Sequence, residues 1–262
     1  MITITYHTRK GGVGKSVLSV HHAWYLVEQG YRVLFINLDT QENSSKTLTD
    51  ATTDPDKAKW QATRAGDAGD ILFRATPPDD ITLEAFTIFT ASASLSLLDT
   101  TTFGYLSENL NLLSPHIDYC IIDTPPAFGI ETAAALAITH YLIAPLELSE
   151  MGLDSLYALM AAKEEMDQYR EEPIHFLGGL INKFDNKPSQ TQILNFIMDS
   201  EELRSALIKG VIKNRQGYAD AFTQRTPVWT GTKTAERDAG NEIKRAFAEI
   251  MTLIDTTENS NG

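Results

Sequence analysis

The chain has 262 residues, 42% of them hydrophobic, a net charge of −13 and one cysteine. This length suffices for one large α/β domain with a sizeable core. Its apolar runs are too short to cross a membrane, and a single cysteine excludes an intrachain disulfide or a zinc site built from cysteines.

Short apolar runs alternate with amphipathic stretches of helical length, which indicates βαβ units around a mainly parallel sheet. The pattern predicts strands at residues 2–6, 32–38, 95–98, 119–123, 141–145, 176–181 and 207–212. It predicts helices at residues 15–29, 130–138, 153–169, 189–200 and 235–254. The predicted fold class is therefore α/β, with a doubly wound, mainly parallel sheet flanked by helices.

Residues 1–255 are expected to form a single nucleotide-binding domain. Within it, residues 47–80 are rich in Thr, Asp, Ala and Pro, and we expect an irregular surface excursion there with one short helix at most. Residues 256–262 are polar and are expected to form a disordered tail. The chain opens on a strand-like run instead of a charged and then apolar leader, which favours a cytoplasmic location.

A glycine-rich motif, KGGVGKS, lies between the first predicted strand and the first predicted helix. Glycines there let successive backbone N–H groups point at phosphate oxygens, and the start of the helix adds a positive dipole end. Lys15 supplies a charge for the outer phosphates, and the hydroxyl of Ser16 suits a Mg²⁺ position. The candidate nucleotide-binding residues here are Lys10, Gly11, Gly12, Val13, Gly14, Lys15 and Ser16.

Two residues of this loop depart from the general phosphate-loop pattern. Arg9 stands where that pattern has glycine, and Lys10 is a second lysine directly before the glycines. The extra lysine resembles the deviant Walker motif of the ParA/MinD superfamily of P-loop ATPases. In that family it reaches across a nucleotide-sandwich dimer, so the resemblance implies an ATP-bound homodimer in which Lys10 and Lys15 both serve catalysis. A solvated loop charge is the alternative for Lys10.

Asp39 follows the second predicted strand, in the sequence INLDTQENSS. Doubly wound sheets bind ligands at the carboxyl ends of their strands, and a carboxylate there suits a catalytic role in orienting water and holding hydrated Mg²⁺. The segment resembles the family's DxDPQxN stretch, with Asn37 for the first Asp and Thr40 for Pro, while Asp39, Gln41 and Asn43 match. An Asp that only caps the following turn is the alternative.

Asp123 ends the most hydrophobic predicted strand, in YCIIDTPPAFG. Four apolar residues followed by Asp form a Walker B pattern, whose carboxylate binds Mg²⁺ through a coordinating water. The next residues, Thr124 to Pro126, form a stiff loop suited to sensing the γ-phosphate, and this DTPP run is similar to the same family. The candidate metal-binding residues are Ser16, Asp39 and Asp123.

Two further strand ends follow. Glu147 and Glu150 lie in a loop that resembles the family's entry to a dimer-face helix, and they are interpreted as solvated charges. Asn182, Lys183 and Asp185 spell NKxD, the pattern that reads guanine in GTPases, whereas in ParA-like proteins an asparagine at this position contacts adenine. Four letters are less specific than the Lys10 loop, so ATP with Mg²⁺ is the expected cofactor and GTP the alternative.

Charge is distributed unevenly, because residues 51–175 hold 20 acidic and 6 basic residues, whereas residues 203–245 hold 9 basic and 4 acidic. A local basic face can bind a polyanion on an acidic protein. The stretch at residues 211–229 resembles the family's last strand, base-pocket loop and next helix. The candidate contacts to the phosphates of non-specific DNA are Lys213, Arg215, Lys233 and Arg237. A merely solvated face is the alternative.

The resemblance covers about residues 1–250 and implies a nucleotide switch. ATP joins two subunits, the dimer binds DNA non-specifically, and slow hydrolysis stimulated by a centromere-binding adaptor protein releases it, so that plasmid or chromosomal DNA is partitioned. It further implies a cytoplasmic, nucleoid-associated protein. One alternative is a MinD-like positioning ATPase for a protein or membrane cargo, although the last helix lacks the basic rim of a membrane-binding helix. The other is a metabolic ligase or amidotransferase-type enzyme on a related fold.

Overall fold

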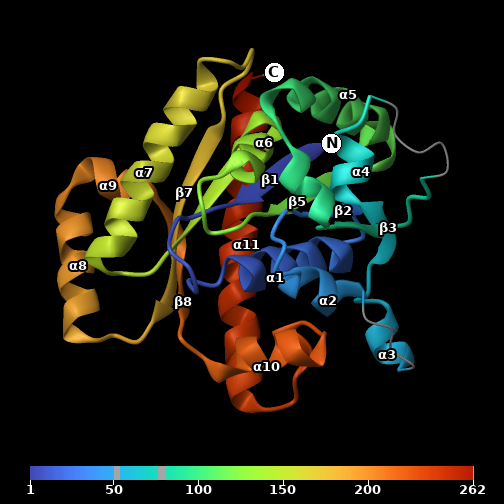
Figure 1. Ribbon diagram of the computed structural model, residues 1–262. Helices are drawn as coiled ribbons and strands as arrows, with labels where there is room; N and C mark the ends of the chain where they lie inside the picture. The colour runs from blue at the N-terminus through green and yellow to red at the C-terminus, as the bar shows by residue number, and fades with distance from the viewer. Residues whose placement is uncertain (50–53, 76–80, 262) are drawn as a thin grey trace.

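The computed structural model describes residues 1–49, 54–75 and 81–261 (Figure 1). Eight strands form one sheet in the order β3-β4-β2-β5-β1-β6-β7-β8, and every neighbouring pair is parallel. Parallel strands that are covered on both faces have largely apolar sequences, and the sequences VLFIN, YCIID and YLIAPL at the centre of this sheet follow that pattern. The strands are β1 (Ile2–Tyr6), β2 (Val33–Asn37), β3 (Thr63–Asp67), β4 (Phe86–Thr90), β5 (Tyr119–Asp123), β6 (Tyr141–Leu146), β7 (His175–Phe184) and β8 (Leu207–Lys213).

Helices cover both faces of this sheet, which confirms the doubly wound α/β class. Alternate residues of β2 illustrate the two sides, since Phe35 packs in the core with α1 and α11 while Leu34 and Ile36 pack with α4, α5 and α6. The same face as these three helices carries α7, α8 and α9 beyond β6. The helices are α1 (Lys15–Glu28), α2 (Asn43–Thr49), α3 (Pro55–Ala58), α4 (Ala68–Leu72), α5 (Phe103–Leu113), α6 (Ile130–Ile138), α7 (Glu150–Asp167), α8 (Pro188–Asp199), α9 (Glu201–Ser205), α10 (Gln216–Gln224) and α11 (Thr234–Asn261).

The topology gathers the candidate residues at one edge of the sheet. The chain leaves β1 toward β2 on one side, and it leaves the adjacent β5 toward β6 on the other side. Loops that diverge in this way open a crevice at the carboxyl ends of the strands, where doubly wound sheets bind ligands. The phosphate loop follows β1, and Asp39 and Asp123 follow or end β2 and β5.

The predicted elements of the sheet centre are confirmed. Strands β1 and β5 and helix α6 match the predicted ranges residue for residue, and the other predicted helices agree with α1, α7, α8 and α11 within a few residues, apart from the C-terminal end of α11. Strong apolar periodicity is responsible, because these elements are buried on at least one whole face. No helix among the described residues is both long and apolar enough to cross a bilayer.

The predicted strand at residues 95–98 is wrong. That run forms the 3-10 helix η1 (Ala93–Leu97), and the strand of this region is β4, whose sequence FTIFT is aromatic and β-branched and pairs with β2. A short apolar run does not distinguish a strand from a buried helical turn, and Leu95 is buried in the turn.

The interpretation of residues 47–80 as an irregular excursion is also wrong for the residues described there. They contain the end of α2, all of α3 and α4, and the strand β3, which pairs with β4. The sequence of β3, TRAGD, is polar because β3 lies at the edge of the sheet and its first residues are exposed. A polar edge strand leaves no apolar run to detect.

Residues 256–261 of the expected disordered tail are instead the last part of α11, which continues through Asn261, and residue 262 lies outside the described residues. The hydroxyls of Thr256, Thr257 and Ser260 donate to carbonyls four residues earlier, and Tyr141 donates from β6 to Glu258 at 2.5 Å. These hydrogen bonds satisfy the polar side chains within the helix. The polar composition of this segment, taken alone, had indicated a disordered tail.

Candidate functional site

The phosphate loop lies between β1 and the N-terminus of α1 and has two left-handed glycines. Gly12 has a φ of 73° and Gly14, the N-cap of α1, has a φ of 93°. A Cβ atom on Gly14 would lie 2.5 Å from the side-chain nitrogen of Asn182, whereas one on Gly11 would meet nothing within 4 Å. Glycine is therefore required at position 14 by both conformation and space.

Replacing Gly14 by alanine is expected to lower the free energy of unfolding by about 1–3 kcal/mol, because it forces an unfavourable φ. It should also weaken nucleotide binding, because the Asn182 contact that shapes the loop must move. Thermal unfolding with and without MgATP measures both effects. Gly11→Ala is the matched control for stability and should change the free energy of unfolding by no more than about 0.5 kcal/mol; equal losses of stability in the two variants would contradict this account of the loop.

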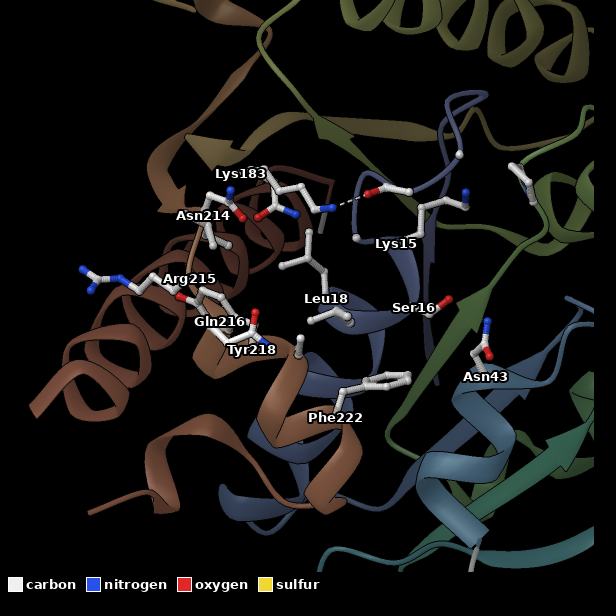
Figure 2. A pocket seen from close by; sticks show the side chains of 18 of the residues that line it. Lys15, Ser16, Leu18, Asn43, Lys183, Asn214, Arg215, Gln216, Tyr218 and Phe222 are labelled. Carbon is white, nitrogen blue, oxygen red and sulfur yellow. Dashed lines mark hydrogen bonds between the residues drawn. The ribbon is translucent and has the colours of Figure 1, made fainter. Parts of the chain in front are cut away.

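A cavity of about 670 Å³ extends from this loop to α10, within the usual range for small-molecule sites. Its polar end includes Lys15, Ser16 and Asp39. Its other end is partly apolar, where Leu18 and Phe222 point inward from α1 and α10 (Figure 2). One end thus suits phosphates and the other a flat base.

Lys15 lines the polar end of the cavity, and its charge interacts with that of Asp123, which is buried beside the cavity and does not line it. Burial lowers the pKa of Lys15, and the charges of Asp123 and Asp39 oppose that shift. Asp123 is fully buried, and burial raises its pKa to about 6, against the hydroxyls of Ser16 and Ser44 and the charge of Lys15, which lower it. The two hydroxyls lie near this carboxylate, but among the described residues no group reaches either of its oxygens in hydrogen-bonding geometry.

These residues fit a bound Mg²⁺ ion. A buried carboxylate with two unpartnered oxygens is costly unless a cation balances it, and the hydroxyl of Ser16 is nearby. The described residues contain no group of three or more His, Cys, Asp or Glu that could hold a metal by themselves. Mg²⁺ is usually held by one or two carboxylates together with substrate phosphates, and Asp123 and Ser16 match that kind of site.

Asp39 both caps a turn and lines the cavity. One of its carboxylate oxygens accepts from the backbone N–H of Gln41 at 3.0 Å, and its own N–H donates to the side chain of Asn37. Asn37 is fully buried and also donates to Ser45 of α2. The two interpretations of Asp39 are therefore compatible, because the turn fixes the carboxylate at the cavity wall.

Lys10 has partners outside this cavity. Its ammonium lies 2.8 Å from a carboxylate oxygen of Glu147 and 3.3 Å from the hydroxyl of Ser149, both in the loop after β6. Its side chain is 21% exposed, so it is not a freely solvated charge. The interpretation of Glu147 as a solvated charge missed this pair. In the sequence, the position of Glu147 in a loop at the end of a strand was the one feature that pointed to this ion pair.

The end of β7 ties down the phosphate loop. Asn182 donates from its amide nitrogen to the carbonyl of Val13 at 2.7 Å. Lys183 donates to the carbonyl of Gly12 at 2.5 Å, the bond drawn as a dashed line in Figure 2. Asp185, by contrast, pairs with Lys187 at 2.7 Å and accepts from Asn214 at 3.3 Å. Asp185 is not among the described residues that line the nucleotide cavity.

The four candidate DNA contacts differ in availability. Arg215 is 25% exposed and pairs with Glu242 at 3.3 Å, with its guanidinium directed out of the cavity (Figure 2). Lys233 is 76% exposed and pairs with Glu236 at 3.3 Å. Lys213 and Arg237 are exposed. Acidic residues of α11 thus interleave with the basic ones, and Arg215 is the least available of the four.

Comparisons with known proteins agree with this geometry. Residues 1–176 match the model of a family described as AAA domain. The chain is 26% identical to protein IncC of Escherichia coli, over 98% of this chain and 71% of that protein. A solved complex of a Cyanothece McdA variant with ATP has a TM-score of 0.76 at 18% identity, over 97% of this chain and 96% of that one. A putative plasmid partition protein of Borrelia burgdorferi B31 bound to AMPPNP has a TM-score of 0.72 at 18% identity, over 98% and 99%.

Proposed function

Because this chain belongs to the AAA domain family, as a ParA-type ATPase of partitioning or positioning systems, we propose that it is a Mg²⁺-dependent, ATP-driven dimerisation switch. In this proposal the ATP-bound dimer binds DNA non-specifically and partitions plasmid or chromosomal DNA with a centromere-binding adaptor. The observation that carries the proposal is the direction of Lys10, which leaves the phosphate loop toward Glu147 instead of its own nucleotide cavity.

Lys10 can pair with Glu147 in its own chain or with a phosphate bound to a second copy, and the expected energies favour the phosphate. Its pair with Glu147 is partly exposed, and such pairs contribute about 0.2–1 kcal/mol. A charge-assisted hydrogen bond to a phosphate contributes about 1.5–3 kcal/mol. Lys10 would therefore leave Glu147 when a second copy presents a triphosphate within its reach, so that nucleotide and dimerisation become linked.

The other residues of the site have separate roles in the proposed reaction. Lys15 balances charge on the outer phosphates, and Asp39 accepts a hydrogen bond from the attacking water. Asp123 and Ser16 would hold Mg²⁺, the carboxylate through a coordinating water, and the ion supplies charge stabilisation at the phosphate oxygens. Intrinsic hydrolysis is expected to be slow, because Lys10 reaches the phosphates only in the dimer.

The nucleotide is expected to be ATP. A guanine-reading NKxD motif needs its aspartate at the base, and Asp185 is instead held by Lys187 and Asn214 outside the cavity wall. Asp185→Asn should therefore leave the ratio of ATP to GTP affinities unchanged within about twofold. In a guanine site the same change removes a charged partner and costs about 2–3 kcal/mol, more than tenfold. Titration of both nucleotides separates these outcomes.

DNA binding rests on the exposed basic residues of β8, α11 and the segment before α11. The acidic residues beside them leave a modest positive balance, so binding should weaken steeply with salt and show no sequence preference. Changing Lys213, Lys233 and Arg237 to alanine together should reduce affinity at low salt. Lys163→Ala is the control, because Lys163 pairs with Asp167 on α7.

The test of the proposed function is DNA binding across a salt series with ATP, ADP or GTP, for the native protein and Lys10→Ala. ATP-specific, salt-sensitive binding that the variant loses supports the proposal. Binding that is independent of nucleotide contradicts it. ATP-dependent sedimentation with liposomes in place of DNA would instead favour a membrane-positioning role.

A further inference from the structure

His7, directly after β1, contacts the loop that follows Asp123. Its Nδ1 atom lies 2.8 Å from the hydroxyl oxygen of Thr124, and both side chains are buried. The Thr124 hydroxyl donates to the carbonyl of Tyr6 at 2.9 Å. A hydroxyl has one proton, so Nδ1 of His7 must be the donor to Thr124. The imidazole is thus held in one tautomer.

A second contact joins the same two segments four residues later. The ring of Phe128 meets the ring of His7 edge-on, with centroids 4.7 Å apart, and the guanidinium of Arg9 lies 5.9 Å from the centroid of Phe128. Both are favourable geometries for aromatic and cation–π contacts. We call His7, Arg9, Thr124 and Phe128 the clasp.

The clasp fixes both ends of a short loop whose middle borders the nucleotide. Pro126 lies between Thr124 and Phe128 and lines the cavity, and Pro125 further stiffens the loop. His7 is itself fixed, because its backbone N–H donates to the carbonyl of Ile143 in β6. If a terminal phosphate displaced Pro126, the movement would therefore be transmitted through Thr124 and His7 to β1, the strand that leads into the phosphate loop.

We propose that His7 and Phe128 are positioning residues that hold the loop at residues 124–128 in the arrangement needed for ATP turnover. They act through Pro126 and the phosphate loop and do not touch the nucleotide. The proposal rests on ATPase activity alone, and neither DNA binding nor dimerisation through Lys10 is assumed.

The test compares variants that keep or remove one contact at a time. Asparagine places an amide donor near the position of Nδ1 of His7, whereas glutamine places one near Nε2. We expect His7→Ala and His7→Gln to lower kcat by about tenfold with KM within about twofold, because the loop is misplaced while the binding residues remain. His7→Asn should recover most of the loss. An equal loss in all three variants, or a rise in KM that accounts for the loss, overturns the proposal.

Variants of Phe128 test the proposal independently of the His7 variants. It is 37% exposed, so Phe128→Ala should fold, and Phe196→Ala on α8, where Phe196 is 56% exposed, is the matched control. We expect Phe128→Ala to lower kcat and to raise hydrogen exchange at the backbone amides of residues 124, 127 and 128, since the two prolines between them have none. The double variant with His7→Ala should lose little more activity than either single variant. Native exchange at these residues, or additive losses, would overturn the proposal even if His7→Ala did not fold.

Discussion

Lys10→Ala is expected to lower ATP turnover by at least about 100-fold, while MgATP affinity of the single chain changes by less than about threefold. Lys10 contacts Glu147 and Ser149 and not its own nucleotide cavity, so its loss spares binding within one chain. A cation supplied from a second molecule to a transferring phosphate accelerates the reaction by about 10³–10⁵. Steady-state turnover and titration calorimetry measure the two quantities.

Glu147→Gln is the matched control for Lys10→Ala. It removes the charge that holds Lys10 inside one chain, and a partly exposed pair contributes about 0.2–1 kcal/mol. Turnover should therefore stay within about fivefold of native and dimerisation should be favoured slightly. If Lys10→Ala instead weakened MgATP binding in proportion to its loss of turnover, Lys10 would belong to its own nucleotide.

Asp123→Asn is expected to abolish the stabilisation that Mg²⁺ adds to the ATP complex and to lower turnover by more than about 100-fold. The same change should stabilise the nucleotide-free protein at pH 7–8, by on the order of 2 kcal/mol. The reason is that burial raises the pKa of Asp123 to about 6, so its charged form destabilises the free fold. Thermal unfolding with and without MgATP measures both effects.

The pH dependence of this effect has a defined sign. The folded-state pKa of Asp123 lies above its ordinary value of 3.8. Between these pH values the folded protein binds more protons than the unfolded chain, so this group makes the fold less stable as pH rises from about 4 to 6. Mg²⁺ competes with that proton, and its stabilisation should fade as pH drops below about 6. A native-like pH profile in Asp123→Asn would contradict the assignment.

Sequence alone predicted the centre of the fold and of the site because both depend on local signals. Strand β1 has apolar and β-branched residues in the sequence ITITY, and β5 is an apolar run; they lead into chemically distinctive residues, namely the glycine loop and Asp123. Parallel topology then brings such strand ends together without further information. The polar edge strand β3 and the polar end of α11 carry no such signal, because contacts from elsewhere, such as Tyr141 to Glu258, stabilise them.

The relations between distant loops were not predictable from one sequence. Lys10 and Glu147 lie 137 residues apart, and only the adjacency of β1 and β6 brings them within 2.8 Å. Asp185 has the right sequence spacing for a guanine reader, yet the turn after β7 directs it to Lys187 and Asn214. Spacing along the chain identifies the residue types of a site, whereas tertiary contacts decide which of them face the ligand.

The mass of Asp39→Ala in solution with MgATP, measured by light scattering, tests the central claim most directly, because this variant should bind ATP without hydrolysing it. We predict a mass near twice the 29.0 kDa of one chain with ATP, one chain with ADP, and one chain with either nucleotide when Lys10→Ala is added. A single-chain mass with saturating ATP, or a dimer that persists without Lys10, would contradict the account.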